Sequence, residues 1–135
     1  MTVELRGRVI CRGVAGGKAL VSRDAISFLG GVDPKTGVVM EKGHCLEGRC
    51  IAGRVLLFPR GKGSTVGSYV MLQLRKNNCA PSAIINLEAE PIIAVGAIIS
   101  GIPMLDRLEK DPYALIRDGA EVRADADRGV VVILE

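Results

Sequence analysis

The chain has 135 residues, of which 48% are hydrophobic and only 3% aromatic, and its formal net charge is +3. This length and apolar content predict a globular chain with a single domain, residues 1–135, and they argue against a disordered chain. The weak, scattered positive charge argues against nucleic acid as the main partner, although it suits a small anionic substrate or an acidic protein partner.

The sequence gives no sign of a membrane segment. Its beginning, MTVELRGRVICRG, alternates polar and apolar residues and lacks the apolar core of a signal peptide. The longest apolar stretch, residues 92–99, is much shorter than the roughly 20 residues that cross a bilayer. We therefore expect a soluble, cytoplasmic protein.

The first third of the chain combines strand patterns with glycine-rich turns. Alternation predicts a half-buried strand over residues 3–9. Gly16 and Gly17 belong to a stretch that predicts turns, followed by a short strand over residues 19–21. Residues 30–48 are expected to form a long, glycine-rich loop, and such loops are usually functional or cover another surface.

The middle of the chain predicts a strand followed by a helix. Residues 51–58 are apolar on both faces, which is typical of a central strand covered on both sides. Apolar residues at three- and four-residue spacing then predict a helix over residues 66–78. Ser64 or Thr65 is a natural N-cap for it, and Asn77-Asn78 is a suitable end.

A second helix is predicted over residues 91–100, with proline at its first position and Gly101 after its end. The β-branched pair Ile92-Ile93 leaves a strand there as the alternative. Further strands are predicted over residues 82–87, 102–105, 121–124 and 130–134. Together, these elements predict an α/β domain. Its middle strands form a small parallel layer, and its terminal strands form a second, antiparallel layer.

The cysteines do not have the spacing of a metal site. The four residues are Cys11, Cys45, Cys50 and Cys79. They form no CxxC pair, and the single histidine, His44, does not complete a zinc or iron–sulfur ligand pattern. We therefore expect them to be buried, reduced thiols, and we expect the isolated chain to bind no metal or iron–sulfur cluster.

Residues 61–65, Gly-Lys-Gly-Ser-Thr, carry the clearest chemistry, because they lie between a buried strand and the start of a helix. Glycines allow the backbone to approach a ligand closely, and a helix N-terminus favours an anion. Ser64 and Thr65 add hydroxyls, and Lys62 adds a cation. The segment predicts either an anion-binding site, formed by Gly61, Lys62, Gly63 and Thr65 around Ser64, or only a glycine turn with a serine cap.

Other catalytic patterns fit poorly. A nucleotide-binding P-loop needs lysine after the final glycine, and GxSxG is absent. His44 is most simply a solvated or capping residue in its loop, with a catalytic or phospho-acceptor role as the alternative.

Three separated motifs resemble a known family in the right order. Residues 58–69, Phe-Pro-Arg-Gly-Lys-Gly-Ser-Thr-Val-Gly-Ser-Tyr, resemble the hallmark of the phosphomevalonate dehydratase small subunits, an aconitase-like family related to aconitase X. Residues 32–37 and 90–98 are also similar to this family. The resemblance extends over essentially the whole chain.

The resemblance implies a swivelling β/β/α domain and a heterodimer with a large subunit that holds an iron–sulfur cluster. The implied reaction is dehydration of (R)-5-phosphomevalonate to trans-anhydromevalonate 5-phosphate, in an archaeal-type mevalonate route to isoprenoids. Gly61-Lys62-Gly63-Ser64 matches the Gly-x-Gly-Ser of aconitase swivel domains, whose serine is the catalytic base. Val66 stands where aconitases have arginine, which implies that tricarboxylate recognition is lost.

Three other functions remain open at this point. A related aconitase X-type dehydratase would act on a substrate similar to cis-3-hydroxyproline. A phosphohistidine carrier domain also uses a swivelling β/β/α fold, and His44 would then be its phospho-acceptor. The chain could also be a purely structural partner subunit.

Overall fold

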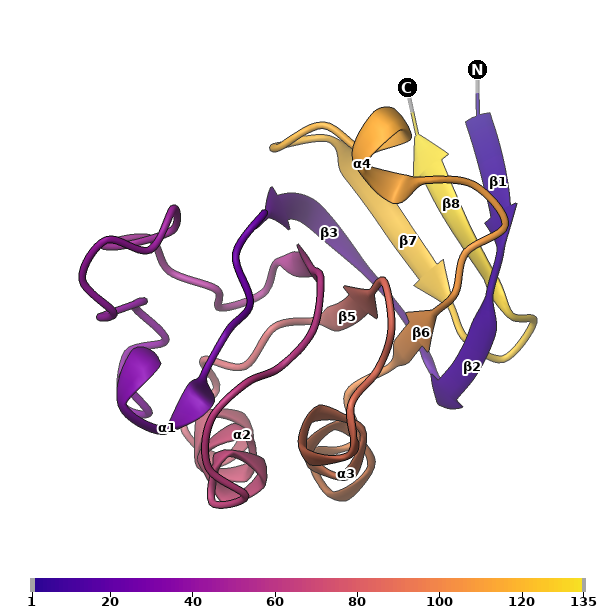
Figure 1. Ribbon diagram of the computed structural model, residues 1–135. Helices are drawn as coiled ribbons and strands as arrows, with labels where there is room; N and C mark the ends of the chain where they lie inside the picture. The colour runs from indigo at the N-terminus through magenta and orange to yellow at the C-terminus, as the bar shows by residue number, and fades with distance from the viewer. Residues whose placement is uncertain (1, 135) are drawn as a thin grey trace.

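The computed structural model describes residues 2–134 and has three layers. An antiparallel sheet packs against one face of a mostly parallel sheet, and two helices cover the other face of the parallel sheet (Figure 1). This is the β/β/α arrangement expected from the sequence, so the predicted fold class is confirmed. No helix among residues 2–134 is long and apolar enough to cross a membrane.

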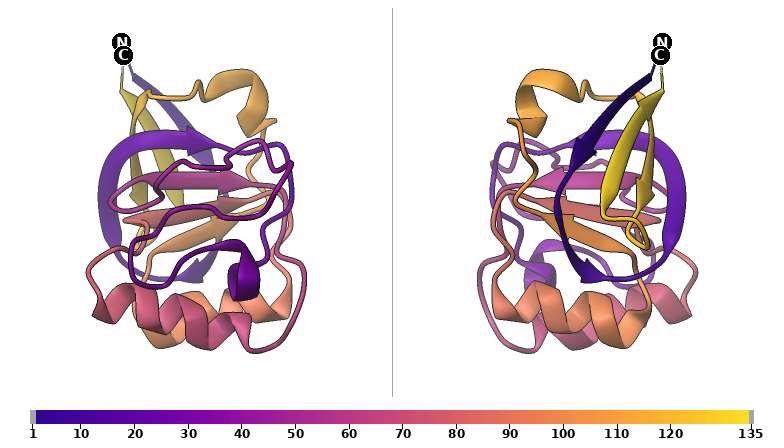
Figure 2. Two further views of the ribbon diagram at one scale, coloured as in Figure 1. Left: turned by 90° about the vertical axis from the view of Figure 1, so that its left-hand side faces the viewer. Right: turned by 90° about the vertical axis from the view of Figure 1, so that its right-hand side faces the viewer.

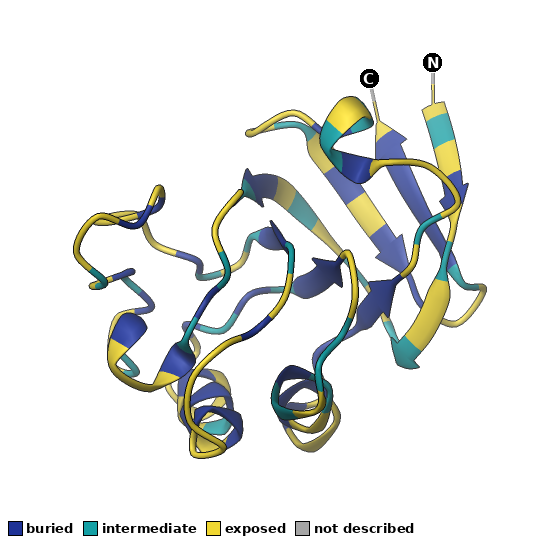
Figure 3. Ribbon diagram, in the orientation of Figure 1, coloured by how far each residue is buried: buried dark blue, intermediate teal, exposed yellow. Residues whose placement is uncertain are grey.

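The parallel sheet supports the glycine loop. Its parallel strands are, in order, β3 (Val14–Val21), β4 (Val55–Phe58), β5 (Ala83–Asn86) and β6 (Met104–Asp106), and β2 (Arg8–Cys11) joins β6 in the antiparallel direction. Every residue of β4 and β5 is buried, because helices and a second sheet cover the two faces (Figure 3). Parallel strands with both faces covered require such continuous apolar runs.

The antiparallel sheet is formed by β1 (Thr2–Arg6), β8 (Val130–Leu134), β7 (Glu121–Asp125) and the first half of β3. The strands predicted over residues 121–124 and 130–134 are confirmed as β7 and β8, which pair as an antiparallel hairpin. β3 passes from one sheet to the other, since residues 14–18 pair with β7 and residues 19–21 pair with β4. The prediction of turns at Gly16 and Gly17 was wrong, because both glycines lie inside β3. A Cβ on Gly17 would stand 2.6 Å from the carbonyl oxygen of Gly53, so glycine here permits a close backbone approach.

The single strand predicted over residues 3–9 is in fact two strands. β1 and β2 are separated by Gly7 and pair with different sheets. A Cβ on Gly7 would stand 2.9 Å from the carbonyl oxygen of Asp106, so the chain can cross between the layers only without a side chain there. Periodicity could not reveal this break, because the alternation of side chains continues through it.

Two apolar clusters fill the spaces between the layers. β4 contributes to both, since alternate strand residues face opposite sides of a sheet. Leu56 and Phe58 belong to the cluster under the helices, and Val55 and Leu57 belong to the cluster between the two sheets. The strand predicted over residues 51–58 is shorter than expected, because residues 51–54 form a turn before β4.

Both predicted helices are present, as α2 (Gly67–Lys76) and α3 (Pro91–Ser100), and they lie side by side along the parallel sheet (Figure 2). Gly101 ends α3 in a left-handed conformation with φ of 67°, as expected. Two short helical turns, α1 (Phe28–Gly31) and α4 (Pro112–Leu115), were not predicted, because four residues are too few for a periodic signal. Residues 32–50 form the expected long loop, with turns and isolated bridges.

Candidate functional site

The glycine loop, defined here as residues 60–66, joins the carboxyl end of β4 to α2. In open α/β sheets, ligands bind in the crevice outside the carboxyl ends of the strands. The backbone of this loop pairs with the segment that follows β3. Ile26 N donates to the Arg60 carbonyl oxygen at 3.2 Å, and Lys62 N donates to the Ile26 carbonyl oxygen at 3.0 Å. Two segments far apart in the sequence are thereby fixed at one edge of the sheet.

Gly61 and Gly63 are glycines for different structural reasons. Gly61 is buried, and a Cβ there would collide with the side chain of Ile93 and stand 2.7 Å from Glu90 Oε1. Gly63 has a φ of 92°, which side chains rarely adopt, and a Cβ there would collide with Ser27 Oγ. The glycine pattern found in the sequence is therefore required by close packing on both sides of Lys62.

Ser64 is exposed in this chain, and its hydroxyl is part of a local turn. Its Oγ accepts a hydrogen bond from Val66 N at 3.1 Å, and its carbonyl oxygen accepts one from Gly67 N at 2.9 Å. The expectation that Ser64 or Thr65 caps the helix was wrong. α2 begins at Gly67 after Val66, and no side chain caps it. An extra turn over residues 64–67 separates Ser64 from the helix proper.

The anion-binding groups also differ from the expectation. The first N–H groups of α2 already donate, because Ser68 N and Tyr69 N bond to the carbonyl oxygens of Thr65 and Val66 at 3.3 and 3.0 Å. Within residues 2–134, the N–H groups of Gly63, Ser64 and Thr65 have no protein acceptor. The groups free to bind an anion are thus those of the glycine loop itself and not those of the helix end.

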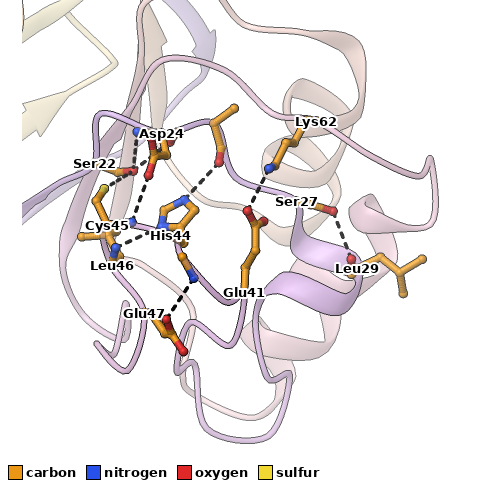
Figure 4. A network of polar contacts seen from close by, with 12 residues as sticks. Ser22, Asp24, Ser27, Leu29, Glu41, His44, Cys45, Leu46, Glu47 and Lys62 are labelled. Carbon is orange, nitrogen blue, oxygen red and sulfur yellow. Dashed lines mark hydrogen bonds and ion pairs between the residues drawn. The ribbon is translucent and has the colours of Figure 1, made fainter.

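Lys62 forms an ion pair with the long loop. Its Nζ lies 2.9 Å from Glu41 Oε2, and both side chains are partly exposed (Figure 4). Lys62 was predicted from the sequence as a cation beside Ser64, whereas Glu41 was not predicted to take part. No sequence pattern could have found Glu41, because it lies 21 residues before Lys62 in an irregular loop.

His44 fixes the long loop to the segment after β3. It is buried, with 6% of its surface exposed, so of the two simple roles expected for it, solvated or capping, the solvated one was wrong. Its Nδ1 accepts from Leu46 N and its Nε2 contacts the Ala25 carbonyl oxygen, both at 3.0 Å (Figure 4). Since Nδ1 is the acceptor, Nε2 carries the proton and donates a hydrogen bond to the Ala25 carbonyl oxygen. Neither nitrogen is free for catalysis or phosphorylation in this conformation.

Asp24, His44 and Cys45 form the one potential metal-ligating group within residues 2–134, with ligand atoms within 4.8 Å of one another. These atoms are already engaged. Asp24 Oδ2 accepts from Cys45 N at 2.9 Å, and this hydrogen bond lowers the pKa of Asp24. The sulfur of Cys45 lies 3.4 Å from Ser22 Oγ. Because the histidine nitrogens hold the loop together, a metal would have to break the contacts that form this group.

The four cysteines differ in burial, although all were predicted to be buried. Cys79 is buried and Cys11 half-buried, and burial raises the pKa of both thiols. Cys45 and Cys50 are exposed, so the expectation of burial was wrong for them. All four are free thiols in the structure.

The carboxyl ends of β5 and β6 carry paired charges that the sequence did not reveal. Buried Asp106 accepts two hydrogen bonds from Arg8, at 2.8 and 2.7 Å. Glu88 accepts two from Arg107, at 2.8 and 2.6 Å, and this contact lowers the pKa of Glu88. Arg107 has a φ of 50°, an uncommon conformation for a residue other than glycine. Both carboxylates are engaged in ion pairs, and the lowered pKa of Glu88 makes it a weak base.

Comparison with known proteins agrees with this geometry. The family model described as the aconitase X swivel domain matches residues 4–133. A "phosphomevalonate dehydratase small subunit" from Methanocella arvoryzae is 62% identical over 129 residues, which are 96% of this chain and 98% of the relative. A protein of the same name from Methanococcoides burtonii is 55% identical over 135 residues, covering 100% and 98% of the two chains.

The fold is shared with a solved structure. The crystal structure of Thermococcus kodakaraensis aconitase X in its holo form has a TM-score of 0.93 and 55% sequence identity, covering 98% of this chain and 99% of the other. The chain therefore belongs to the aconitase X swivel-domain family.

Proposed function

We propose that this chain is the small subunit of a phosphomevalonate dehydratase, a hydro-lyase that works together with a large subunit. The reaction is the dehydration of (R)-5-phosphomevalonate to trans-anhydromevalonate 5-phosphate. The observation that carries the proposal is the 55–62% identity, over 96–100% of this chain, to relatives with that name. Residues 1–135 would act as one swivel domain in the cytoplasm.

We propose that Ser64 is the proton acceptor. Dehydration removes a proton from the carbon next to a carboxylate and a hydroxide from the neighbouring carbon. A free serine hydroxyl is a weak base, so its anion must be stabilised. The Val66 N–H already donates to Ser64 Oγ at 3.1 Å, and a hydrogen bond to the charged form favours that form. Asp24 and Glu88, whose pKa values are lowered, are poorer candidates at this edge.

We propose that the anionic substrate binds to Gly61, Lys62, Gly63 and Thr65. The N–H groups of Gly63 and Thr65 have no acceptor within the described chain and can donate to an oxyanion. Lys62 supplies a positive charge when a substrate anion competes with Glu41 for its ammonium group. The glycines keep this surface free of side chains, so that the substrate can approach the backbone.

We place the iron–sulfur cluster on the large subunit, where it supplies the Lewis acidity that a departing hydroxide needs. Two of the four thiols of this chain suit that division of labour. Cys11 and Cys79 point their sulfurs at backbone carbonyls, and burial raises their pKa, which disfavours the thiolate that binds iron. The small subunit contributes the base, and the partner contributes the electrophile.

The alternative functions are weaker. A phosphohistidine carrier needs an accessible imidazole, whereas both His44 nitrogens are bonded and the ring is buried. A dehydratase for a substrate similar to hydroxyproline would use the same serine, and only the substrate distinguishes it. A structural partner subunit would not need Ser64.

The test is reconstitution of this chain with its large subunit under anaerobic conditions. We expect turnover of (R)-5-phosphomevalonate by the complex and none by either subunit alone. Cis-3-hydroxyproline is the comparison substrate. Turnover of hydroxyproline with none of phosphomevalonate would contradict the proposed substrate, and phosphorylation of His44 by a phosphodonor would favour the carrier function.

A further inference from the structure

The outer layer of the molecule is formed by two helices in very close contact. Gly96 of α3 lies against Met71 of α2 so closely that a Cβ on Gly96 would collide with the Met71 sulfur. Ser68 Oγ donates to the Ile92 carbonyl oxygen at 2.9 Å and ties the first turns together. On the side away from the sheet, the helices leave a groove whose lining includes Thr65, Tyr69, Leu72, Ile92, Val95 and Ile99.

This groove is apolar although it faces solvent in the isolated chain. No charged side chain lines it, and α3 contains no charged residue at all. Tyr69 is 65% exposed, Val95 49% and Ile99 44%. The helices of a soluble domain normally present polar side chains on the face away from the core, so a continuous apolar surface indicates an interaction site.

The groove is continuous with the site of Ser64. Thr65 lines its end and directly follows Ser64 in the chain. A protein that occupies the groove therefore lies beside the glycine loop, where Ser64 is exposed and the N–H groups of residues 63–65 have no acceptor within the described chain. The proposed proton transfer needs those groups to be shielded from water, because a low-dielectric environment strengthens their electrostatic effect.

We propose that the groove between α2 and α3 is the docking surface for the large subunit. This inference rests on the proposed function, and the relatives' name, "small subunit", supplies the larger partner. A second copy of this chain is a poorer occupant, because it would cover the glycine loop with a surface that lacks the other half of the site. A lipid surface is also a poorer occupant, because no basic side chain lines the groove.

The test compares Val95→Glu with the matched control Val14→Glu. Both valines are about half exposed, at 49% and 52%, but Val14 begins β3 and does not line the groove. Binding to the large subunit is measured by titration, with thermal melting of each free variant as the folding control. We expect Val95→Glu to weaken binding at least about tenfold, since a charge would be buried without a partner. Val14→Glu should stay within about twofold of the unchanged protein.

Tyr69→Glu is the second variant, because the more exposed Tyr69 side chain tolerates a charge without unfolding the helix. Unchanged affinity in both Val95→Glu and Tyr69→Glu would overturn the proposal. Concentration-dependent dimers of the free chain that disappear in these variants, or apolar-face binding to anionic vesicles, would also overturn it in favour of another occupant. Because the readout is binding, a stable complex that lacks dehydratase activity would contradict the proposed function and leave the docking surface intact.

Discussion

Glu41 Oε2 lies 2.9 Å from Lys62 Nζ, so the long loop is joined by an ion pair to the residue two positions before Ser64. The side chains are 32% and 47% exposed, and such pairs contribute only about 0–1 kcal/mol to stability. The pair is therefore weak enough to exchange for a substrate anion. This relationship separates two roles for Lys62, namely anchoring the loop and binding the substrate.

Lys62→Met and Glu41→Gln test these roles as a pair. If Lys62 binds the substrate anion, Lys62→Met should raise KM by about 10- to 100-fold, the usual value of a hydrogen bond to a charged group. Glu41→Gln should lower KM or leave it unchanged, because it removes the competing carboxylate. Steady-state kinetics of the complex give both values. An equal rise of KM in the two variants would assign Lys62 to the anchoring role alone.

Ser64→Ala should remove most of the turnover while the fold and the complex remain. A positioned general base contributes about 10²- to 10⁴-fold to the rate, so kcat should fall by at least that range. Substrate binding should change little, because proton transfer belongs to the transition state. Thr65→Ala is a comparison for stability only, and we expect near-normal stability because no side chain caps α2. A Ser64→Ala complex with normal kcat would move the base to the large subunit or to Lys62.

Gly61→Ala should be more destabilising than Gly43→Ala, by up to about 1 kcal/mol. A methyl group at Gly61 would collide with Ile93 and approach Glu90 Oε1, and overpacking of this kind costs about 1–3 kcal/mol. Gly43 has a φ of 81° but nothing within 4 Å of an added Cβ, so only the backbone conformation opposes alanine, at about 1–2 kcal/mol. Urea denaturation of the two variants gives the comparison. Equal midpoints would show that Ile93 can move aside.

His44→Ala should release the long loop without unfolding the sheets. The change removes the acceptor of Leu46 N and leaves the Ala25 carbonyl oxygen without its donor, at a cost of about 1–3 kcal/mol. Hydrogen exchange of residues 41–47 should accelerate, whereas exchange in β4 and β5 should not. Lys42→Ala, an exposed change in the same loop, serves as the control. We also predict that this loop lies at or near the edge of the interface with the large subunit, and the same measurement with and without that subunit tests this.

Tyr113 should make the protein sensitive to high pH. Its hydroxyl donates to the Ser22 carbonyl oxygen at 2.6 Å, and burial raises the pKa of Tyr113 from 10.0 to about 12. The folded protein favours the neutral phenol of Tyr113. The contribution of this group to the free energy of unfolding is therefore complete below its unfolded-state pKa of about 10, and it is lost as pH rises towards 12. Urea midpoints of the unchanged protein should fall between about pH 9 and about pH 11.5. Tyr113→Phe should be less stable at neutral pH by about 1 kcal/mol, and its urea midpoint should fall less as the pH is raised.

The amino-acid sequence by itself determined the elements whose signals are local. The glycine and serine residues of the loop were identified because they form one uninterrupted segment between an apolar strand and a helix. α3 was located by Pro91 at its start and Gly101 at its end, since each residue suits only one end of a helix. The resemblance of residues 58–69 to the family added the fold and the identity of Ser64 as the expected base.

Only the tertiary structure decided where distant segments meet. Gly7 and Gly17 had no distinctive local pattern, and their importance follows from close approaches to Asp106 and Gly53, which are remote in the sequence. Likewise, the contacts of Glu41 with Lys62 and of His44 with Ala25 arise because an irregular loop folds back over the ends of parallel strands. The path of such a loop depends on packing and charge between residues far apart in the chain, and local propensity contains no information about either.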